Sequence, residues 1–149
     1  MFEPGTIALV GVGLAILGPI IAAAYTIITC GTANAGVGIK KPRLLSRLII
    51  TVVLGEALAI YGLLIAFMLL SKLPLITSTN AANTALMAGI IIAGSCISAS
   101  AGISYSGIVL AGATLEREET FSSNVIAVVL SEALAIYGLL MSFMLIGQI

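Results

Sequence analysis

The sequence has few charged residues and no tryptophan or histidine, and these shortages limit what the chain can be. Charged residues make up 8% of the chain, against about 25% in an ordinary soluble domain, while 60% of it is hydrophobic. Too little polar surface is available to cover a water-soluble globule, so we expect the surrounding medium to be lipid. Six basic and six acidic residues cancel, which gives no reason to expect a nucleic-acid partner.

The chain is also poor in residues that bind metals or perform catalysis. Its two cysteines, Cys30 and Cys96, fall in separate apolar segments and are interpreted as small packing residues. With so few ligands available, we predict no disulfide, no metal site and no cofactor. Gly11 and Gly13 belong to an apolar run with no preceding strand, so they are not a nucleotide fingerprint. The chain is not expected to be an enzyme on its own.

Four apolar runs are long enough to cross a bilayer, which takes about 20 helical residues. The first run lacks the basic start of a signal peptide and exceeds the length of a signal core, so we interpret it as a retained helix. No run shows the alternation of barrel strands, and the expected fold is an all-α membrane protein of two tandem helical hairpins, residues 1–75 and 76–149. The predicted helices cover residues 6–33, 46–71, 84–113 and 122–147.

The basic residues predict how the chain is oriented in the membrane. Four lie in the turn predicted at residues 34–47, and Arg117 lies in the turn predicted at residues 114–120, whereas the opposite side has only Lys72. Because basic residues concentrate in cytoplasmic loops, both hairpin turns are expected in the cytosol and both termini on the lumenal side.

Small residues concentrate in the first and third predicted helices. The first is dense in glycine and alanine, and the third places Gly94, Ser98, Gly102 and Ser106 at strict four-residue spacing. Small residues at this interval let helices approach closely in lipid. We therefore expect these two helices in a crowded interior, with the bulkier second and fourth helices facing lipid, and neighbouring subunits packed side by side.

The two halves contain the same segment. Residues 55–69 and 131–145 are identical at twelve of fifteen positions, at an offset of 76 residues (132 − 56). Since each half contains two spans, both halves enter the membrane in the same direction, as parallel repeats.

Glu56 and Glu132 are the only acidic or basic side chains well inside a span. Placing such an acid at the centre of a membrane helix costs about 3 kcal/mol. Apolar neighbours favour the neutral carboxyl, so each glutamate could carry a proton when facing lipid and release it when facing water. Candidate hydrogen-bond partners at similar depth are Tyr25, Thr26, Ser98 and Ser106. No Asn or Gln is expected at that depth to complete a sodium site, which favours H⁺ over Na⁺.

The segment from Glu56 to Leu63 resembles the proteolipid subunits in the membrane rotor ring of eukaryotic vacuolar-type H⁺-ATPases. The stretch from Gly31 to Arg43 has the same resemblance. The first half is most similar to the larger c″-type proteolipid, whereas the length and Glu132 are more similar to the ordinary 16-kDa c-type proteolipid.

This resemblance implies a rotor ring of the same or related proteolipid chains embedded in membrane lipid. It also implies an adjacent stator subunit a, whose arginine holds the deprotonated glutamate, central-stalk subunits such as d, and a vacuolar or other acidic endomembrane. Glu56 matches the c″ carboxylate and Glu132 the c-type one. Family members generally rely on one glutamate in this motif, so a chain with two departs from the pattern.

Two other interpretations stay open at this stage. A small proton-coupled secondary transporter also has four helices and a membrane glutamate, but it carries its acid in the first helix and lines its pocket with aromatic residues, which make up only 5% of this chain. A structural or pore-forming oligomer without ion turnover would tolerate glutamine at both positions.

Overall fold

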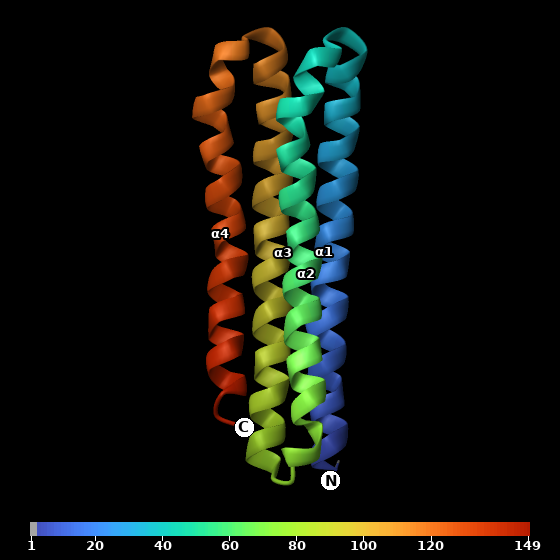
Figure 1. Ribbon diagram of the computed structural model, residues 1–149, viewed down its shortest axis with the longest axis vertical. Helices are drawn as coiled ribbons and strands as arrows, with labels where there is room; N and C mark the ends of the chain where they lie inside the picture. The colour runs from blue at the N-terminus through green and yellow to red at the C-terminus, as the bar shows by residue number, and fades with distance from the viewer. Residues whose placement is uncertain (1–2) are drawn as a thin grey trace.

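The computed structural model describes residues 3–149 and consists of four long helices joined by short 3-10 turns (Figure 1). All four helices are long and apolar enough to cross a membrane, which confirms the predicted fold class. The elements are α1 (Pro4–Lys40), η1 (Pro42–Leu44), α2 (Leu45–Lys72), η2 (Leu73–Leu75), α3 (Thr79–Glu116), η3 (Glu118–Thr120) and α4 (Phe121–Ile146).

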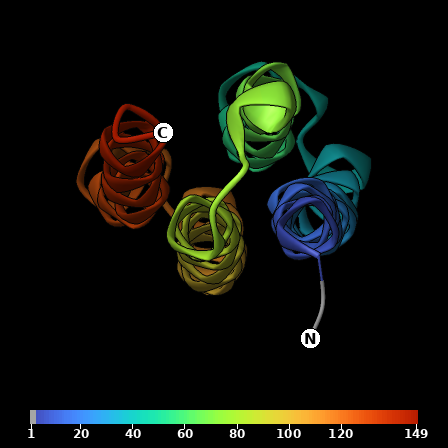
Figure 2. The same cartoon turned by 90° about the horizontal axis from the view of Figure 1, so that it is seen from below.

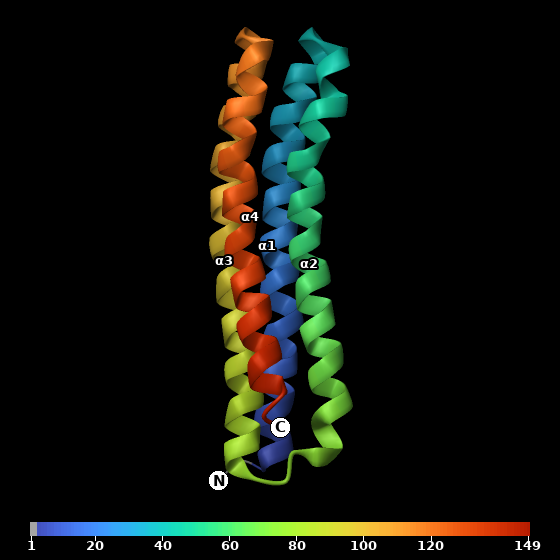
Figure 3. The ribbon, with the colours of Figure 1, turned by 60° about the vertical axis from the view of Figure 1, so that its left-hand side comes forward.

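The helices form two hairpins that lie side by side. Viewed from below, α1 and α3 are neighbours, with α2 and α4 displaced together to one side of them (Figure 2). Helix α1 packs extensively against α3, and each also packs against the following helix of its own hairpin. The turns η1 and η3 lie at one end of the bundle, and the termini lie towards the other (Figure 3). This arrangement fits parallel repeats, while the assignment of one end to the cytosol stays a prediction.

Backbone chemistry explains where the helices begin and end. Lys41 leaves the helical region, with φ −139° and ψ 79°, because a residue that precedes proline is disfavoured in helical conformation. Helix α3 begins after Ser78, whose hydroxyl accepts a hydrogen bond from the amide of Ala81 at 3.2 Å. Such a cap satisfies one of the free amides at a helix start.

The first predicted turn was too long. The sequence suggested a polar turn over residues 34–47, but α1 continues to Lys40. Asn34, which sequence reasoning placed in that turn, is buried and donates to the carbonyl oxygen of Leu48 at 3.0 Å and to Thr51 Oγ1 at 3.2 Å. The side-chain amide of Asn34 therefore bonds α2, while its Oδ1 atom is buried with no hydrogen-bond partner within residues 3–149, and α1 continues past this polar residue.

The contact between α1 and α3 depends on glycine, but not mainly on the evenly spaced stripe of α3. A Cβ built on Gly89 would collide with the backbone of Gly11, and one on Gly18 would lie 2.5 Å from the Cβ of Ala93. In the predicted stripe, Gly94 has nothing within 4 Å of such a Cβ, whereas Gly102 faces Ser131 of α4. Residues of the stripe therefore face either an open surface, as Gly94 does, or α4, as Gly102 does. A different face of α3 packs on α1.

Hydroxyl groups also join α1 to α3 inside the bundle. The hydroxyls of Thr26 and Ser100 lie 2.8 Å apart, and Thr29 donates to Ser104 at 2.9 Å. Thr26, Ser100 and Ser104 are buried. Because the alternative is an unsatisfied polar group in an apolar interior, these bonds fix the register of the two repeats.

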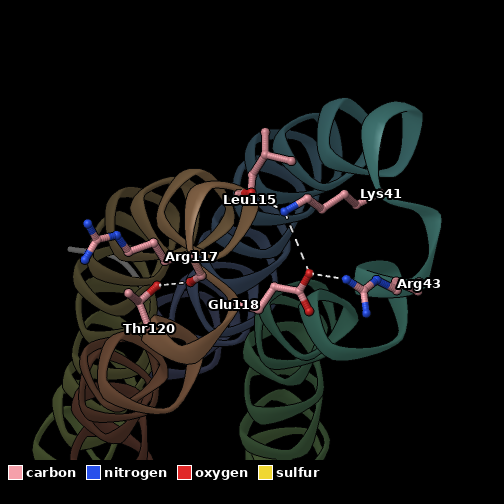
Figure 4. Close-up of polar contacts among 6 residues, drawn as sticks. All are labelled: Lys41, Arg43, Leu115, Arg117, Glu118 and Thr120. Atoms are coloured by element: carbon pink, nitrogen blue, oxygen red, sulfur yellow. Dashed lines mark hydrogen bonds and ion pairs between the residues drawn. The ribbon is translucent and has the colours of Figure 1, made fainter.

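Charged side chains connect the two hairpins at the turn end. Glu118 accepts from Arg43 at 2.5 Å and lies 3.7 Å from Lys41 Nζ, which donates to the carbonyl oxygen of Leu115 at 2.8 Å (Figure 4). These contacts join η1 to η3 across the bundle. The side chain of Arg43 is 74% exposed, so its ion pair contributes little to stability.

Candidate functional site

Glu132 lies buried on α4, where only 7% of it is exposed. The hydroxyl of Tyr61 on α2 donates a hydrogen bond to its Oε1 atom. Nearby, Gly138 brings α4 close to α3, since a Cβ there would collide with the side chain of Ser95. The acid of the second repeat is therefore held by a residue of the first repeat.

Glu56 lies in a different environment. It is exposed, and the structure shows no hydrogen bond or ion pair for it among residues 3–149. Its side chain lines a groove between α1 and α2 whose other lining residues are Ile16, Ile20, Ala59, Ile60 and Leu63. None of these side chains can solvate a charge.

The four hydroxyls proposed as glutamate partners bond elsewhere or point elsewhere in this chain. Thr26 bonds Ala22 and Ser100, while Ser98 donates to the carbonyl oxygen of Gly94 at 2.9 Å. Ser106 donates to the carbonyl oxygen of Gly102 at 2.6 Å. A helical serine or threonine readily bonds the carbonyl four residues earlier, and that local bond competes with a distant carboxyl.

Tyr25 is half exposed in a groove between α1 and α3, with Ile21 and Tyr105, and this groove does not include Glu56. The depth of the hydroxyls was nevertheless a useful guide. Gly55, next to Glu56, packs on Thr26, because a Cβ there would lie 2.6 Å from Thr26 Cγ2. Position along the bundle could be read from the hairpin, but the direction of each side chain could not.

Tyr61 is the site residue that sequence reasoning did not single out. A signal for it existed, because the tyrosine follows the glutamate by five residues in both repeats, as Tyr61 and Tyr137. The contact joins Tyr61 to the glutamate of the other repeat, and this pairing depends on how the two hairpins pack. A tyrosine hydroxyl can donate to a carboxylate or accept from a carboxylic acid, so Tyr61 can serve Glu132 in both protonation states.

The site consists of two membrane carboxyls, Glu56 and Glu132. Within residues 3–149, the structure shows no group of three or more His, Cys, Asp or Glu side chains that could hold a metal ion. Cys30 and Cys96 are separate, free and buried. What remains is a pair of membrane carboxyls, one enclosed and one on the surface of the chain.

This four-helix bundle, with one carboxyl inside the membrane span of each hairpin, belongs to the family of the ATP synthase C subunit. The family profile matches the chain twice, over residues 10–69 and 86–145. One match falls in each hairpin, at the 76-residue offset of the internal repeat.

Among curated proteins, the chain is similar to proteolipid subunits of V-type proton ATPases. It is 26% identical to the c″ subunit of Saccharomyces cerevisiae over 145 residues, which cover 92% of this chain and 66% of that protein. It is 27% identical to the 16 kDa proteolipid (the c subunit) of Bos taurus over 138 residues, covering 93% of this chain and 89% of that one. The c″2 subunit of Arabidopsis thaliana is 33% identical over 78 residues, covering 52% and 44%.

The chain therefore spans about two thirds of the yeast c″ protein, less than half of the Arabidopsis one and most of the bovine 16 kDa proteolipid. Similarity to both c-type and c″-type proteolipids agrees with the mixed resemblance of its two halves.

Proposed function

We propose that this chain is a proton-carrying subunit of the membrane rotor ring of a V-type ATPase, and that Glu56 and Glu132 carry the protons. The observation that carries the proposal is the duplicated carboxyl, placed at the same position in two hairpins of a proteolipid fold. A glutamate kept only as a structural hydrogen-bond partner would not explain why the carboxyl occurs twice, at the same position of the same local sequence.

The chemistry of the proposal is a cycle of one proton at each carboxyl. Facing lipid, the side chain is neutral because an ionised carboxylate is costly in hydrocarbon. On meeting a cationic group of a stator, it loses the proton and remains as the carboxylate, since a nearby positive charge favours the ionised form. Tyr61 would stabilise the carboxylate of Glu132 by donating to it.

As a proteolipid subunit, the chain itself does not catalyse ATP hydrolysis. Its partners in the proposal are other proteolipid chains, a stator subunit a that supplies the cation, central-stalk subunits such as d, and membrane lipid. The turns η1 and η3 would face the cytosol and the termini the lumen of a vacuole or another acidic compartment. The excess of basic residues at the turn end supports that orientation.

The proposal predicts that a membrane-permeant carbodiimide, which attacks protonated carboxyls, modifies both glutamates in vesicles holding the assembled ATPase. Modified sites would be located by peptide mass spectrometry, and ATP-driven acidification would be followed in parallel. Acidification should be lost in step with the labelling of these two glutamates. Complete modification of both glutamates with unchanged acidification would contradict the proposal.

The alternative is a small proton-coupled transporter, and it can be tested in vesicles that contain this chain alone. Such a protein would move protons in vesicles that contain this chain alone, whenever a gradient of its substrate is imposed. The groove at Glu56 is lined by aliphatic side chains and not by the aromatic residues that line the pocket of such a transporter. We therefore expect no substrate-dependent proton flux from the isolated chain.

A further inference from the structure

The first repeat leaves open a helix face that its counterpart in the second repeat buries. Gly89 and Gly107 of α3 both lie against α1, Gly89 on the backbone of Gly11 and Gly107 with its Cβ position 2.7 Å from Cys30 Sγ. Their counterparts 76 residues earlier are Gly13 and Gly31, and neither has anything within 4 Å of its Cβ position. The outer face of α1 thus repeats the face that α3 uses inside the chain.

The second repeat leaves open the complementary face. Gly18 of α1 packs on Ala93, but its counterpart Gly94 has nothing within 4 Å of its Cβ position. Ala22 is buried against α3, whereas its counterpart Ser98 is exposed. At these two positions the outer face of α3 repeats the face that α1 uses inside the chain, whereas the counterpart of Gly11 is the exposed Met87.

The same symmetry applies to the carboxyl sites. Inside the chain, Tyr61 donates to Glu132 across the boundary between the repeats. The counterparts of these two residues are Tyr137, which is 64% exposed, and Glu56, which is exposed and has no partner within residues 3–149. One chain thus holds one complete tyrosine–glutamate pair and the two separated halves of a second pair, on opposite edges of the bundle.

We propose that Tyr137 of one copy of this chain donates a hydrogen bond to Glu56 of the next copy, so that the Glu56 site is completed only between copies. We assign the open edge to a second copy of the chain. The outer face of α1 in one copy would pack on the outer face of α3 in the next, as α3 and α1 pack between the repeats of one chain. The inference rests on the proposed function only in regarding Glu56 as a proton carrier; the contact itself stands on the repeat geometry.

Cross-linking between differently tagged copies tests the contact. One copy carries Tyr137→Cys and the other Glu56→Cys, and membranes of cells making both, with the rest of the ATPase intact, are treated with a permeant bifunctional thiol reagent long enough to span a tyrosine–glutamate pair. A link between the two tags is expected. The parent chain provides the background, because Cys30 and Cys96 are buried.

The matched control carries Tyr61→Cys on one tagged copy and Glu132→Cys on the other. That pair lies within one chain, so no link between tags is expected, although a chain carrying both changes should link internally. If Tyr137→Cys and Glu56→Cys copies do not link while the internal pair does, the next chain is not a second copy in this register and the proposal fails.

A conservative substitution gives a second test that does not depend on introduced cysteines. Tyr137→Phe removes the hydroxyl that holds the Glu56 carboxyl in the proposed contact, so Glu56 should label several-fold faster with carbodiimide in the assembled ring. After the ring is dissociated into single chains in detergent, the same change should leave the rate at Glu56 unaltered. Equal rates for parent and Tyr137→Phe in the assembled ring would overturn the proposal.

These measurements separate failure of the contact from failure of the proposed function. Neither linking nor labelling requires ATP-driven pumping. If the contact is found but labelling of both glutamates leaves acidification unchanged, the copy-to-copy site stands and proton carriage does not. If acidification depends on Glu56 but no link forms, a different chain completes the site.

Discussion

The two hairpins contain the same segment, but their glutamates differ in exposure and in hydrogen bonding. Glu132 is 7% exposed and bonded by Tyr61, whereas Glu56 is exposed in an aliphatic groove with no partner among residues 3–149. The local sequences cannot cause this difference, since they are nearly identical. Position in the chain causes it, because Glu132 faces the junction between the repeats and Glu56 faces the outer edge of the bundle.

The comparison teaches that a tandem repeat completes one fewer site than it contains. Two hairpins in one chain have a single internal junction, and only that junction can bring a tyrosine of one repeat to a glutamate of the other. The remaining site needs a neighbouring chain. This is the expected consequence of a heterologous contact, in which each unit offers two different faces.

The largest difference between the halves should come from their counterpart glycines. Gly89→Leu should prevent stable packing of α1 on α3, because its side chain would have to displace the backbone of Gly11. Gly13→Leu should leave the single chain folded but block its assembly into a ring. Yield and thermal unfolding of the dissociated chain, together with the mass of the intact ring, would report both effects. Equal damage to the single chain from the two changes would contradict this contrast.

The next largest effect is expected at the internal tyrosine. Tyr61→Phe removes the hydrogen bond to Glu132, and bonds to charged groups are worth about 1.5–3 kcal/mol. Carbodiimide labelling of Glu132 should accelerate several-fold, with Glu56 unchanged, because the carboxyl is no longer held by the Tyr61 hydroxyl; peptide mass spectrometry would measure both rates. A similar acceleration at both sites would show that the change loosens the whole bundle rather than one pair.

A smaller effect is expected for the hydroxyl contacts that join the repeats. Thr26→Val and Ser100→Ala should each destabilise the chain by about 0.6 kcal/mol, and a double-mutant cycle should show that the two changes are coupled. Ser98→Ala is the matched control, because Ser98 is exposed and bonds only its own helix. Unfolding in mixed detergent would measure all of these. Additive losses from Thr26 and Ser100 would argue against a direct bond.

The smallest effect is expected at the exposed ion pair of the turns. Arg43→Gln should change stability by less than about 1 kcal/mol, and the change should shrink further as salt rises, because the side chain is 74% exposed. Arg47→Gln, at an exposed position on α2, is the control. A loss of several kcal/mol at Arg43 would show that η1 and η3 hold the two repeats together more firmly than their exposure suggests.

Much of this architecture could be predicted from the sequence, for identifiable reasons. Span length, the 76-residue offset and the isolation of Glu56 and Glu132 in apolar runs are local properties of the chain. They led to four helices, two parallel hairpins and two candidate carboxyls. The end of α1 could not be predicted in the same way, because the side-chain amide of Asn34 donates to Leu48 and Thr51 of a different helix.

The rotation of each helix was equally out of reach of the sequence. Gly94 and Gly102 belong to one evenly spaced stripe, yet one is open and the other faces α4. Thr26 lies at the depth expected for a partner of Glu56 but bonds Ser100. Depth follows from counting residues back from a turn, whereas direction depends on tertiary packing.

The central claim is that both glutamates carry protons despite their unlike surroundings. ATP-driven acidification by vesicles containing the assembled ATPase tests it most directly, with Glu56→Gln, Glu132→Gln, the double variant and Glu116→Gln, a change of the same chemistry at an exposed helix end. We predict that each membrane substitution abolishes acidification while the ring still assembles, and that Glu116→Gln does not. Acidification that persists in the double variant would contradict the account.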